Sequence, residues 1–313
     1  MRKAIVWVTD ERGLGLAEHS VAVALLTQGA TPCLIFCVGF EPPVATNLTA
    51  AAERRGNIVE YRRLAQREVS QKLYTARESH KHVSPAAASK MDALWALKGE
   101  FDRALYVDSD VLLMEDFGLE RVEFDGLALA AVYDFGKVGE LGDDVGFHTR
   151  CAENGLSPHY FNSGVLAVDL SALSELHVDA YQDALSQHRK RCGYHPSCSC
   201  VDQCAWNMAF AWKWKRLSIA DNFQACAIFN DGWRKAKARH YVGPIKFIPI
   251  KKWRNDKRDT DLIRSAQIAL GLPPAKKPGL GITRKLNLLR KASARKEASR
   301  ALARVAEMHE ASM

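Results

Sequence analysis

No apolar run in the sequence approaches the ~18 residues that a membrane-spanning helix requires. The apolar segment that follows Met1-Arg2-Lys3 is too short for the hydrophobic part of a signal peptide and is typical of a first β-strand. Internal repeats are also missing, which argues against a solenoid. These absences lead us to expect a protein that is made in the cytosol and kept there.

Positive charge is scarce outside the C-terminal region. The chain of 313 residues has a formal net charge of +8, but the segment from Pro274 to the end holds ten Lys and Arg against three Glu, a net +7. The rest of the chain is therefore nearly neutral. We expect no basic groove on the main domain and no nucleic-acid partner.

The repeated cysteine pairs of a structural zinc site are missing as well, although the chain has eight cysteines. Four of them crowd into one segment around His195: Cys192, Cys198, Cys200 and Cys204. A cytosolic chain of this size has no need of disulfides, so free and partly buried thiols are expected. A metal site or a redox-sensitive loop is the alternative.

What the sequence does contain is a regular alternation of strand and helix patterns. Residues 3–8, 33–38 and 57–63 fit strands, and residues 16–28 and 45–55 fit helices. This alternation predicts an α/β fold with a mainly parallel sheet and helices on both faces. Further predicted elements are a helix over 85–97 with Ser84 as its N-cap, strands over 104–110, 127–133 and 161–170, and helices over 171–190 and 201–212. The Gly- and Pro-rich composition after residue 270 predicts one domain over 1–270, followed by a linker and basic helical tail over 271–313.

The apolar run Leu105-Tyr106-Val107 ends in Asp108-Ser109-Asp110. In a strand the side chains alternate between faces, so Asp108 and Asp110 would point the same way and Ser109 away. Two carboxylates on one face need a cation or hydrogen-bond donors, and a divalent metal that prefers oxygen is the natural partner. Because Asp-x-Asp is also common as an acidic turn, this segment alone leaves both interpretations open.

Further motifs follow at characteristic separations. They are Tyr160-Phe-Asn-Ser-Gly-Val165, Asp202-Gln203, Asn222-Phe-Gln224 and His240-Tyr-Val-Gly-Pro-Ile-Lys246. With the Asp-x-Asp strand, they make residues 1–250 resemble glycosyltransferase family 8, the retaining transferases that include glycogenin and the bacterial lipopolysaccharide galactosyl- and glucosyltransferases. The resemblance implies a single Rossmann-like domain of the GT-A type. It also implies transfer of a hexosyl group, galactose or glucose, from a UDP-sugar.

A bound divalent metal, Mn²⁺ or Mg²⁺, is implied by the same resemblance. Asp108 and Asp110 supply oxygen ligands in this interpretation, and His240 is the third ligand. An imidazole beside carboxylates suits Mn²⁺ somewhat better than Mg²⁺. Such an ion neutralises the phosphate charge of the leaving group and acts as a Lewis acid.

The diphosphate of the donor is assigned to residues near these ligands. By resemblance, Lys246 contacts the diphosphate, where a cation offsets the charge that builds on the leaving oxygen. Gly243 would let the backbone approach the phosphates closely. Ser109, between the two acids, is counted with the donor-binding residues. The sequence departs from the family in Lys246-Phe-Ile, where Lys-Pro-Trp is frequent, so the local packing is expected to differ.

Residues before the Asp-x-Asp segment complete the donor site. Lys90 matches a basic residue that faces the nucleotide-sugar, and Lys98 and Arg103 are alternatives for that role. Thr9 and Asp10 end the first strand, where ligands gather in open α/β sheets and where the family holds uracil and ribose. The aromatic residue often found just downstream is missing, and Asp10 has a turn cap as its alternative role.

The sugar and acceptor pocket is assigned by resemblance to Asp134, Asn162, Asp202 and Gln203. Polar groups there bind sugar hydroxyls. Gln203 matches the residue placed against the β face of the anomeric carbon, and an amide is a poor nucleophile. The resemblance therefore implies displacement from the front face with retention, in which a leaving phosphate oxygen deprotonates the acceptor.

The C-terminal tail has two interpretations. Residues 283–309 place Arg and Lys around a predicted helix, which is typical of a solvated basic extension. The other interpretation is peripheral binding to anionic lipid on the inner face of the membrane, with leucines in the interface. The expected acceptor is a saccharide or a lipid-linked or protein-linked glycan.

Two other functions compete with the transferase. A phosphatase of the haloacid dehalogenase type also has an apolar strand before Asp-x-Asp, where the first Asp is a nucleophile. Gly142-Asp143-Asp144 resembles its late acidic motif, although it follows too closely. The third hypothesis is a non-catalytic protein with a transferase-like fold that its basic tail recruits to a membrane.

Overall fold

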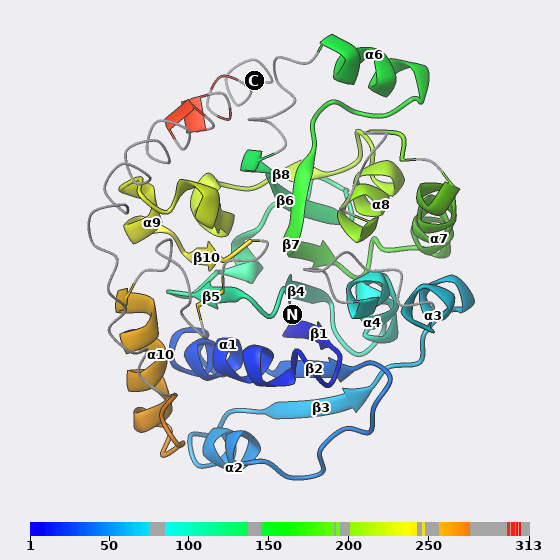
Figure 1. The fold of residues 1–313 in the computed structure, drawn as a ribbon. Coiled ribbons are helices and arrows are strands. Elements are labelled where there is room, and N and C mark those ends of the chain that lie inside the picture. Colours follow the sequence, from blue (N-terminus) through cyan, green and yellow to red (C-terminus); the bar gives the residue numbers. More distant parts are fainter. Residues whose placement is uncertain are drawn as a thin grey trace.

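One seven-stranded sheet forms the centre of the described part of the chain, in the order β3-β2-β1-β4-β7-β6-β8 (Figure 1). This computed structural model describes residues 1–75, 85–136, 145–190, 192–194, 201–242, 246–247, 257–275, 299–300, 302–303, 305 and 307. Neighbouring strands run parallel except beside β7, which is antiparallel to β4 and to β6. The predicted α/β fold with a mostly parallel sheet is therefore confirmed.

The strands of this sheet are β1 (Lys3–Thr9), β2 (Cys33–Cys37), β3 (Val59–Arg63), β4 (Arg103–Val107), β6 (Leu129–Tyr133), β7 (Phe161–Asp169) and β8 (Lys215–Arg216). A smaller sheet has the order β5-β10-β9 and contains β5 (Val111–Leu113), β9 (Phe223–Gln224) and β10 (Ala238–His240). The helices are α1 (Leu14–Thr27), α2 (Asn47–Glu53), α3 (Glu68–Thr75), α4 (Lys90–Ala96), α6 (Val145–Glu153), α7 (Glu175–Lys190), α8 (Val201–Ala209), α9 (Gly232–Lys235) and α10 (Lys257–Ala269). Short 3-10 turns are η1 (Pro85–Ser89), η2 (Leu119–Arg121), η3 (Ile219–Asn222) and η4 (Ala225–Ala227).

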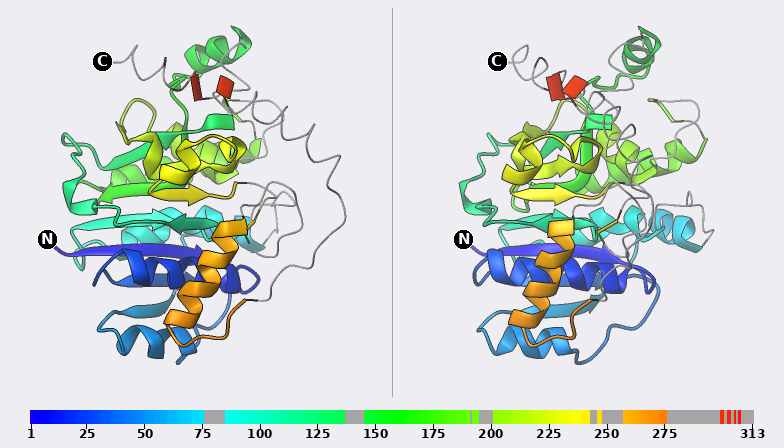
Figure 2. Two further views of the ribbon diagram at one scale, coloured as in Figure 1. Left: turned by 90° about the vertical axis from the view of Figure 1, so that its left-hand side faces the viewer. Right: turned by 60° about the vertical axis from the view of Figure 1, so that its left-hand side comes forward.

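Alternate residues of β1 enter two different hydrophobic cores. Ile5 and Trp7 belong to the core that contains residues of α1 and α10, whereas Val6 and Val8 belong to the core that contains residues of α4, α7 and α8. This division follows from the period of two in a strand that is buried on both faces. The side views of Figure 2 show α10 lying across α1, so the main sheet has helices on both faces as predicted.

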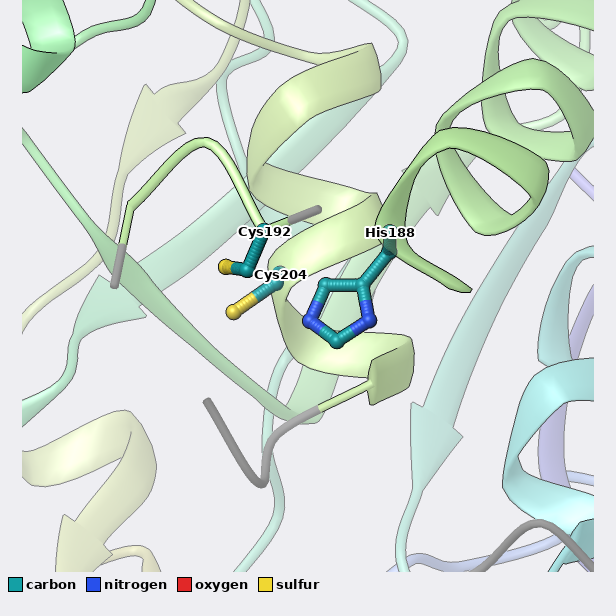
Figure 3. A group of neighbouring side chains, drawn as sticks. All are labelled: His188, Cys192 and Cys204. Atoms are coloured by element: carbon teal, nitrogen blue, oxygen red, sulfur yellow. The ribbon is translucent and has the colours of Figure 1, made fainter. Parts of the chain in front are cut away.

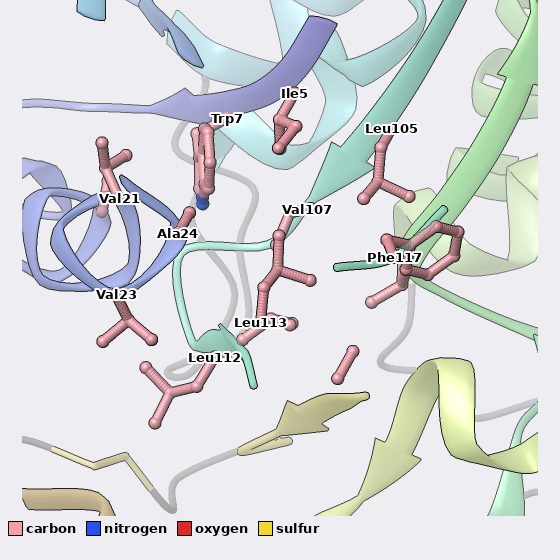
Figure 4. Close-up of a cluster of buried hydrophobic side chains, with 14 of the residues drawn as sticks. Ile5, Trp7, Val21, Val23, Ala24, Leu105, Val107, Leu112, Leu113 and Phe117 are labelled. Atoms are coloured by element: carbon pink, nitrogen blue, oxygen red, sulfur yellow. The ribbon is translucent and has the colours of Figure 1, made fainter. Parts of the chain in front are cut away.

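The core beneath α1 fixes the position of β5 (Figure 4). Ser20 on α1 accepts a hydrogen bond from Trp7 Nε1 at 3.0 Å and donates one to the carbonyl oxygen of Val111. The hydroxyl of Thr27, at the end of α1, donates to the carbonyl oxygen of Leu113 at 3.0 Å. Both ends of β5 are therefore tied to α1, which holds the segment just before β5 in place.

The predicted strand over 104–110 is wrong at its end. β4 stops at Val107, and residues 108–110 form a turn that is closed by a hydrogen bond from Val111 N–H to the carbonyl oxygen of Asp108, at 3.0 Å. The reason is that the chain leaves the main sheet here to enter the smaller sheet as β5, which pairs with β10. The argument from side-chain alternation therefore does not apply to Asp108 and Asp110, whose placement comes from the turn.

Other expectations need smaller corrections. The predicted helix over 85–97 is divided into the 3-10 turn η1 and the helix α4, and Ser84 lies outside the described residues. Gly142-Asp143-Asp144 and nearly all of 283–309 also lie outside them, so the basic helical tail and the boundary at residue 270 stay predictions. Val305 is fully buried in the same core as α1. Within the described residues no helix has the length and hydrophobicity that crossing a membrane demands.

Candidate functional site

Three residues with metal-ligating side chains meet between the two sheets. Asp108 and Asp110 come from the turn after β4, and His240 ends β10, which pairs with β5. Nε2 of His240 lies 3.4 Å from Oδ1 of Asp110 and 3.9 Å from Oδ2 of Asp108. One ligand atom from each residue lies within 4.8 Å of the other two. The structure thus brings together residues that are separated by 130 positions in the sequence.

The imidazole of His240 is oriented by a buried amide. Nδ1 of His240 lies 3.1 Å from Oδ1 of Asn222, whose Nδ2 donates to Oδ1 of Asn162 at 3.0 Å. Because Asn222 offers its oxygen here, Nδ1 of His240 donates to it and Nε2 faces the two acids. A second partner of this kind fixes the tautomer of a metal-binding histidine.

A glycine makes room for this histidine. Gly164 lies in β7 against the imidazole, and a Cβ atom added at Gly164 would lie 2.1 Å from Cε1 of His240. That distance is far below any normal contact, so an alanine would push the ring away. The same glycine accepts a hydrogen bond from Asp108 N–H at 2.8 Å through its carbonyl oxygen. Gly164 of the Asn-Ser-Gly motif in β7 therefore leaves room for His240 and also holds the backbone of Asp108 in place.

Two lysines are paired with the carboxylates of the site. Nζ of Lys90 lies 3.0 Å from Oδ1 of Asp108 and 2.8 Å from Oδ2 of Asp202, and it donates to the carbonyl oxygen of Ser163 at 3.1 Å. Lys246 forms an ion pair with Asp110. Lys90 is fully buried, whereas Lys246 is half-buried. The site therefore contains one cation that solvent cannot reach and one near its opening.

These pairs shift the protonation of the groups involved. Burial raises the pKa of Asp110, but Lys246 and His240 outweigh it and hold that pKa well below its ordinary value. Burial lowers the pKa of Lys90, but Asp108 and Asp202 outweigh it and raise that pKa above its usual range. The pKa of Asp202 is lowered by Lys90 in spite of burial. Asp110 and Asp202 are therefore ionised and Lys90 is charged near neutral pH.

A network of side chains lies beside the metal-ligating group. Nε2 of Gln203 and Nδ2 of Asn162 both donate to Oδ2 of Asp134, at 3.0 and 2.9 Å. Oε1 of Gln203 accepts from Asn162 Nδ2 at 3.1 Å. Asn162 then connects through Asn222 to His240. The four residues predicted to line the sugar pocket, which include Asp202 beside Lys90, are thus continuous with the predicted metal ligands.

The predicted nucleoside residues occupy the adjacent strand end. In the parallel pairing of β1 with β4, Val6 is opposite Tyr106, so Thr9 and Asp10 lie at the same sheet edge as Asp108. Oδ1 of Asp10 accepts a hydrogen bond from Gly13 N–H at 2.9 Å. Asp10 therefore caps the turn before α1, which is the alternative role given above.

The structure also separates the three candidate cations. Lys90 is at the site, whereas Nζ of Lys98 donates to the carbonyl oxygens of Leu170 and Leu173, and Arg103 donates to carbonyl oxygens of residues 119–122. Ser109 is half-buried in the turn between the two acids. Gly243 lies outside the described residues.

Sequence reasoning missed two residues that orient the site. Asn222 was noticed only as part of a motif, yet it is fully buried and bridges Asn162 and His240. The hydroxyl of Tyr106 donates to Oδ1 of Asp108 at 2.6 Å. Its place in the motif Asn222-Phe-Gln224 was the available signal for Asn222. Tyr106 looked like an ordinary strand residue, so no signal pointed to it.

The donor set fits a hard divalent cation. Two carboxylates and one imidazole are oxygen and nitrogen ligands of the kind that Mn²⁺ and Mg²⁺ accept, and the two carboxylates match the charge of the ion. Asp108 keeps 27% of its side chain exposed, which gives an ion and a phosphate access.

Comparison with known proteins gives a family and a fold. A model of the family described as glycosyl transferase family 8 matches residues 16–255. No curated protein gives a significant match. The galactosyltransferase LgtC, solved with donor and acceptor sugar analogues, has a TM-score of 0.65 at 16% identity, over 84% of this chain and 95% of LgtC. The bifunctional glycosyltransferase WbbM has a TM-score of 0.61 at 16% identity, over 86% of this chain and 51% of WbbM. GlyE of Streptococcus pneumoniae has a TM-score of 0.56 at 15% identity, over 88% of this chain and 66% of that one.

Proposed function

Because the chain belongs to glycosyltransferase family 8, we propose that it is a retaining transferase that moves a hexosyl group from a UDP-sugar to a saccharide or glycoconjugate acceptor. The transferred sugar is galactose or glucose. The observation that carries the proposal is the group of Asp108, Asp110 and His240, with its ligand atoms within 4.8 Å of one another. Membership of this family is inconsistent with the phosphatase hypothesis.

Asp108, Asp110 and His240 would hold the divalent cation. When bound, Mn²⁺ or Mg²⁺ supplies a Lewis acid that neutralises the diphosphate and stabilises the departing UDP. Lys246, which is paired with Asp110, would contact the diphosphate when a donor binds. Its ammonium group offsets the charge that develops on the leaving oxygen.

The amide network orients the sugar and does not attack it. Gln203 donates to Asp134 and accepts from Asn162 and from Ser163 N–H, so its amide is fixed by contacts on both ends. An amide held in this way is a weak nucleophile. Asp134 and Asn162 bind sugar hydroxyls. The acceptor hydroxyl attacks the face of the sugar from which UDP leaves, and a phosphate oxygen of the leaving UDP takes the hydroxyl proton. Retention follows from attack on the face that UDP leaves.

The test is release of UDP from a panel of UDP-sugars with Mn²⁺, with Mg²⁺ and with EDTA. We expect turnover of UDP-galactose or UDP-glucose that EDTA abolishes. Asp108→Asn and His240→Ala should each abolish it as well. The matched control is Asp183→Asn, which changes an exposed acid on α7 and should leave turnover unchanged.

Two results would contradict the proposal. If no donor in the panel is turned over, the protein is the non-catalytic type of molecule described above. If Asp108→Asn retains the turnover of the wild type, then the metal is held elsewhere.

We also propose that the protein binds a membrane surface near its acceptor. The basic segment 283–309 would hold a cytoplasmic enzyme at the anionic inner face of the membrane, close to lipid-linked acceptors. Flotation with anionic and neutral liposomes, with and without residues 274–313, tests this. Equal binding of both forms to anionic vesicles would overturn it.

A further inference from the structure

A second group of metal-ligating residues lies outside the transferase site. His188 is near the end of α7, Cys192 follows that helix, and Cys204 lies on α8. One ligand atom from each lies within 4.8 Å of the other two, and all three residues are buried. Figure 3 shows the imidazole of His188 facing the side chains of Cys192 and Cys204.

The imidazole of His188 has unused bonding capacity. Only 8% of the residue is exposed, and its Nε2 has no hydrogen-bond partner among the residues that the structure describes. A buried ring nitrogen without a partner is uncommon and calls for an explanation such as a bound ion. The position of His188, four residues before Cys192, also matches the short ligand spacings found in zinc sites.

We propose that His188, Cys192 and Cys204 bind Zn²⁺ as a structural site. Zn²⁺ bonds of about 2.3 Å to sulfur and 2.0–2.1 Å to nitrogen place tetrahedral sulfur ligands about 3.8 Å apart, within the observed spread. Two thiolates balance the charge of the ion, and soft ligands of this kind select zinc over Mn²⁺ or Mg²⁺.

The surroundings fit a closed zinc site. Cys192 and Cys204 belong to a small hydrophobic cluster with Phe147, Tyr160 and Tyr194. Tyr160 Oη lies 3.0 Å from Sγ of Cys204, where its hydroxyl can donate to a thiolate. Hydrogen bonds of this type support metal ligands from behind and raise metal affinity.

The site would connect α7 to the part of α8 that carries the transferase residues. Cys204 directly follows Asp202 and Gln203, and Tyr160 directly precedes the Phe-Asn-Ser-Gly motif of β7. An ion bound to α7 and α8 together would therefore hold the start of α8 against β7. This inference concerns a structural ion and stands whether or not the proposed transferase activity is correct.

The experiment measures metal content and does not depend on activity. The full-length protein, purified without chelators and dialysed, is expected to hold about one Zn²⁺ per chain, and Asp108→Asn should hold the same amount. Cys204→Ala and His188→Ala should lose it. The matched control is Cys226→Ala, because that cysteine packs against a different core.

A second measurement covers the case in which these variants fail to fold. Wild-type protein reconstituted with Co²⁺ should show the near-ultraviolet charge-transfer absorption of thiolate ligands, and its intensity counts the sulfur atoms bound. His195, Cys198 and Cys200 lie outside the described residues, and this count shows whether another thiol completes the shell. Tyr160→Phe should weaken Zn²⁺ binding about 10- to 100-fold.

Three outcomes would overturn the proposal. The first is wild-type protein without zinc that also gives no thiolate absorption with Co²⁺. The second is a Cys204→Ala protein that keeps its zinc. The third is a disulfide between Cys192 and Cys204 in the purified protein, detected as a loss of about 2 Da by mass spectrometry.

Discussion

The described part of the chain contains two groups of three residues that could bind a metal ion, and they differ in ligand chemistry, burial and charge. Asp108, Asp110 and His240 offer mostly oxygen and lie at a sheet edge, where Asp108 is partly open to solvent. The group of His188, Cys192 and Cys204 offers sulfur and nitrogen and is buried in an apolar cluster. The first suits an ion that arrives and leaves with a nucleotide, whereas the second suits an ion held for the lifetime of the fold.

The two groups also differ in how the protein balances their charge. The two carboxylates of the first group are paired with Lys90 and Lys246. Two protonated thiols carry no charge, so the second group becomes ionic only as metal displaces protons. Loss of metal should therefore leave the first group intact and destabilise the second.

The largest expected effect comes from removing Lys90, the buried cation that is paired with Asp108 and Asp202. Lys90→Ala leaves the buried carboxylate of Asp202 without its partner, so we expect the free energy of unfolding to fall by about 3–5 kcal/mol, measured by urea denaturation. The control is Lys98→Ala, an exposed lysine that donates only to backbone carbonyls, for which about 0.5–1.5 kcal/mol is expected. Equal losses would show that Lys90 does not balance buried charge.

The next prediction distinguishes the two groups, because adding one methyl group at Gly164 should disturb only the first. Gly164→Ala would force the imidazole of His240 aside, so we expect metal-dependent turnover to fall about 100-fold, a loss near 2.7 kcal/mol in the transition state. The zinc content should not change. Gly15→Ala, where an added Cβ meets nothing within 4 Å, is the control and should have no effect on turnover. Normal turnover in Gly164→Ala would exclude His240 as a ligand.

A smaller effect is expected from changing Asn222, the hydrogen-bond partner of His240. Asn222→Ala removes the acceptor of His240 Nδ1, so we expect Mn²⁺ affinity to weaken about 10- to 100-fold, measured from the metal dependence of UDP release. Asn222→Asp keeps an acceptor there and should retain more affinity than Asn222→Ala. If the two variants are equal, the hydrogen bond does not set the tautomer.

The smallest effect concerns acid pH. The folded-state pKa values of Asp110 and Asp202 are lowered by lysine and histidine neighbours, so their stabilisation is present above the unfolded pKa near 3.9 and is lost as the pH falls below it. We expect about 1–2 kcal/mol to disappear below pH 4, seen as a falling melting temperature. Zinc should leave at a higher pH, because thiolates take up protons more readily than these carboxylates. Loss of zinc only below pH 4 would contradict the thiolate assignment.

The sequence predicted the sheet better than the turns. Strand and helix patterns at 3–8, 16–28 and 33–38 agree with β1, α1 and β2, because each is set by local apolar periodicity. The turn at 108–110 was missed because only the pairing of β5 with β10, more than a hundred residues later, draws the chain out of the main sheet.

In the candidate site, too, the residues in local motifs were predicted and the contacts between distant segments were not. The motifs identified Asp108, Asp110 and His240 as a set, and the structure brings them together. They could not identify Asn222 as a partner, because hydrogen bonds between segments that are distant in the sequence leave no local pattern. The segment around Cys192 shows a further limit of the sequence, which did not indicate that His188 belongs with these cysteines. Its spacing indicated free thiols as the main interpretation, and His188, which lies outside that segment, became visible only once α7 and α8 were packed together.

The contact between Lys246 and Asp110 has a consequence for the order of binding under the proposed function. The lysine occupies one carboxylate that the cation needs, so a diphosphate that draws Lys246 away also frees Asp110 for the ion. Each ligand then removes an obstacle to the other, and linkage requires that the gain in affinity be the same in both directions. The chain therefore favours loading of metal and nucleotide as a unit and resists holding either one alone.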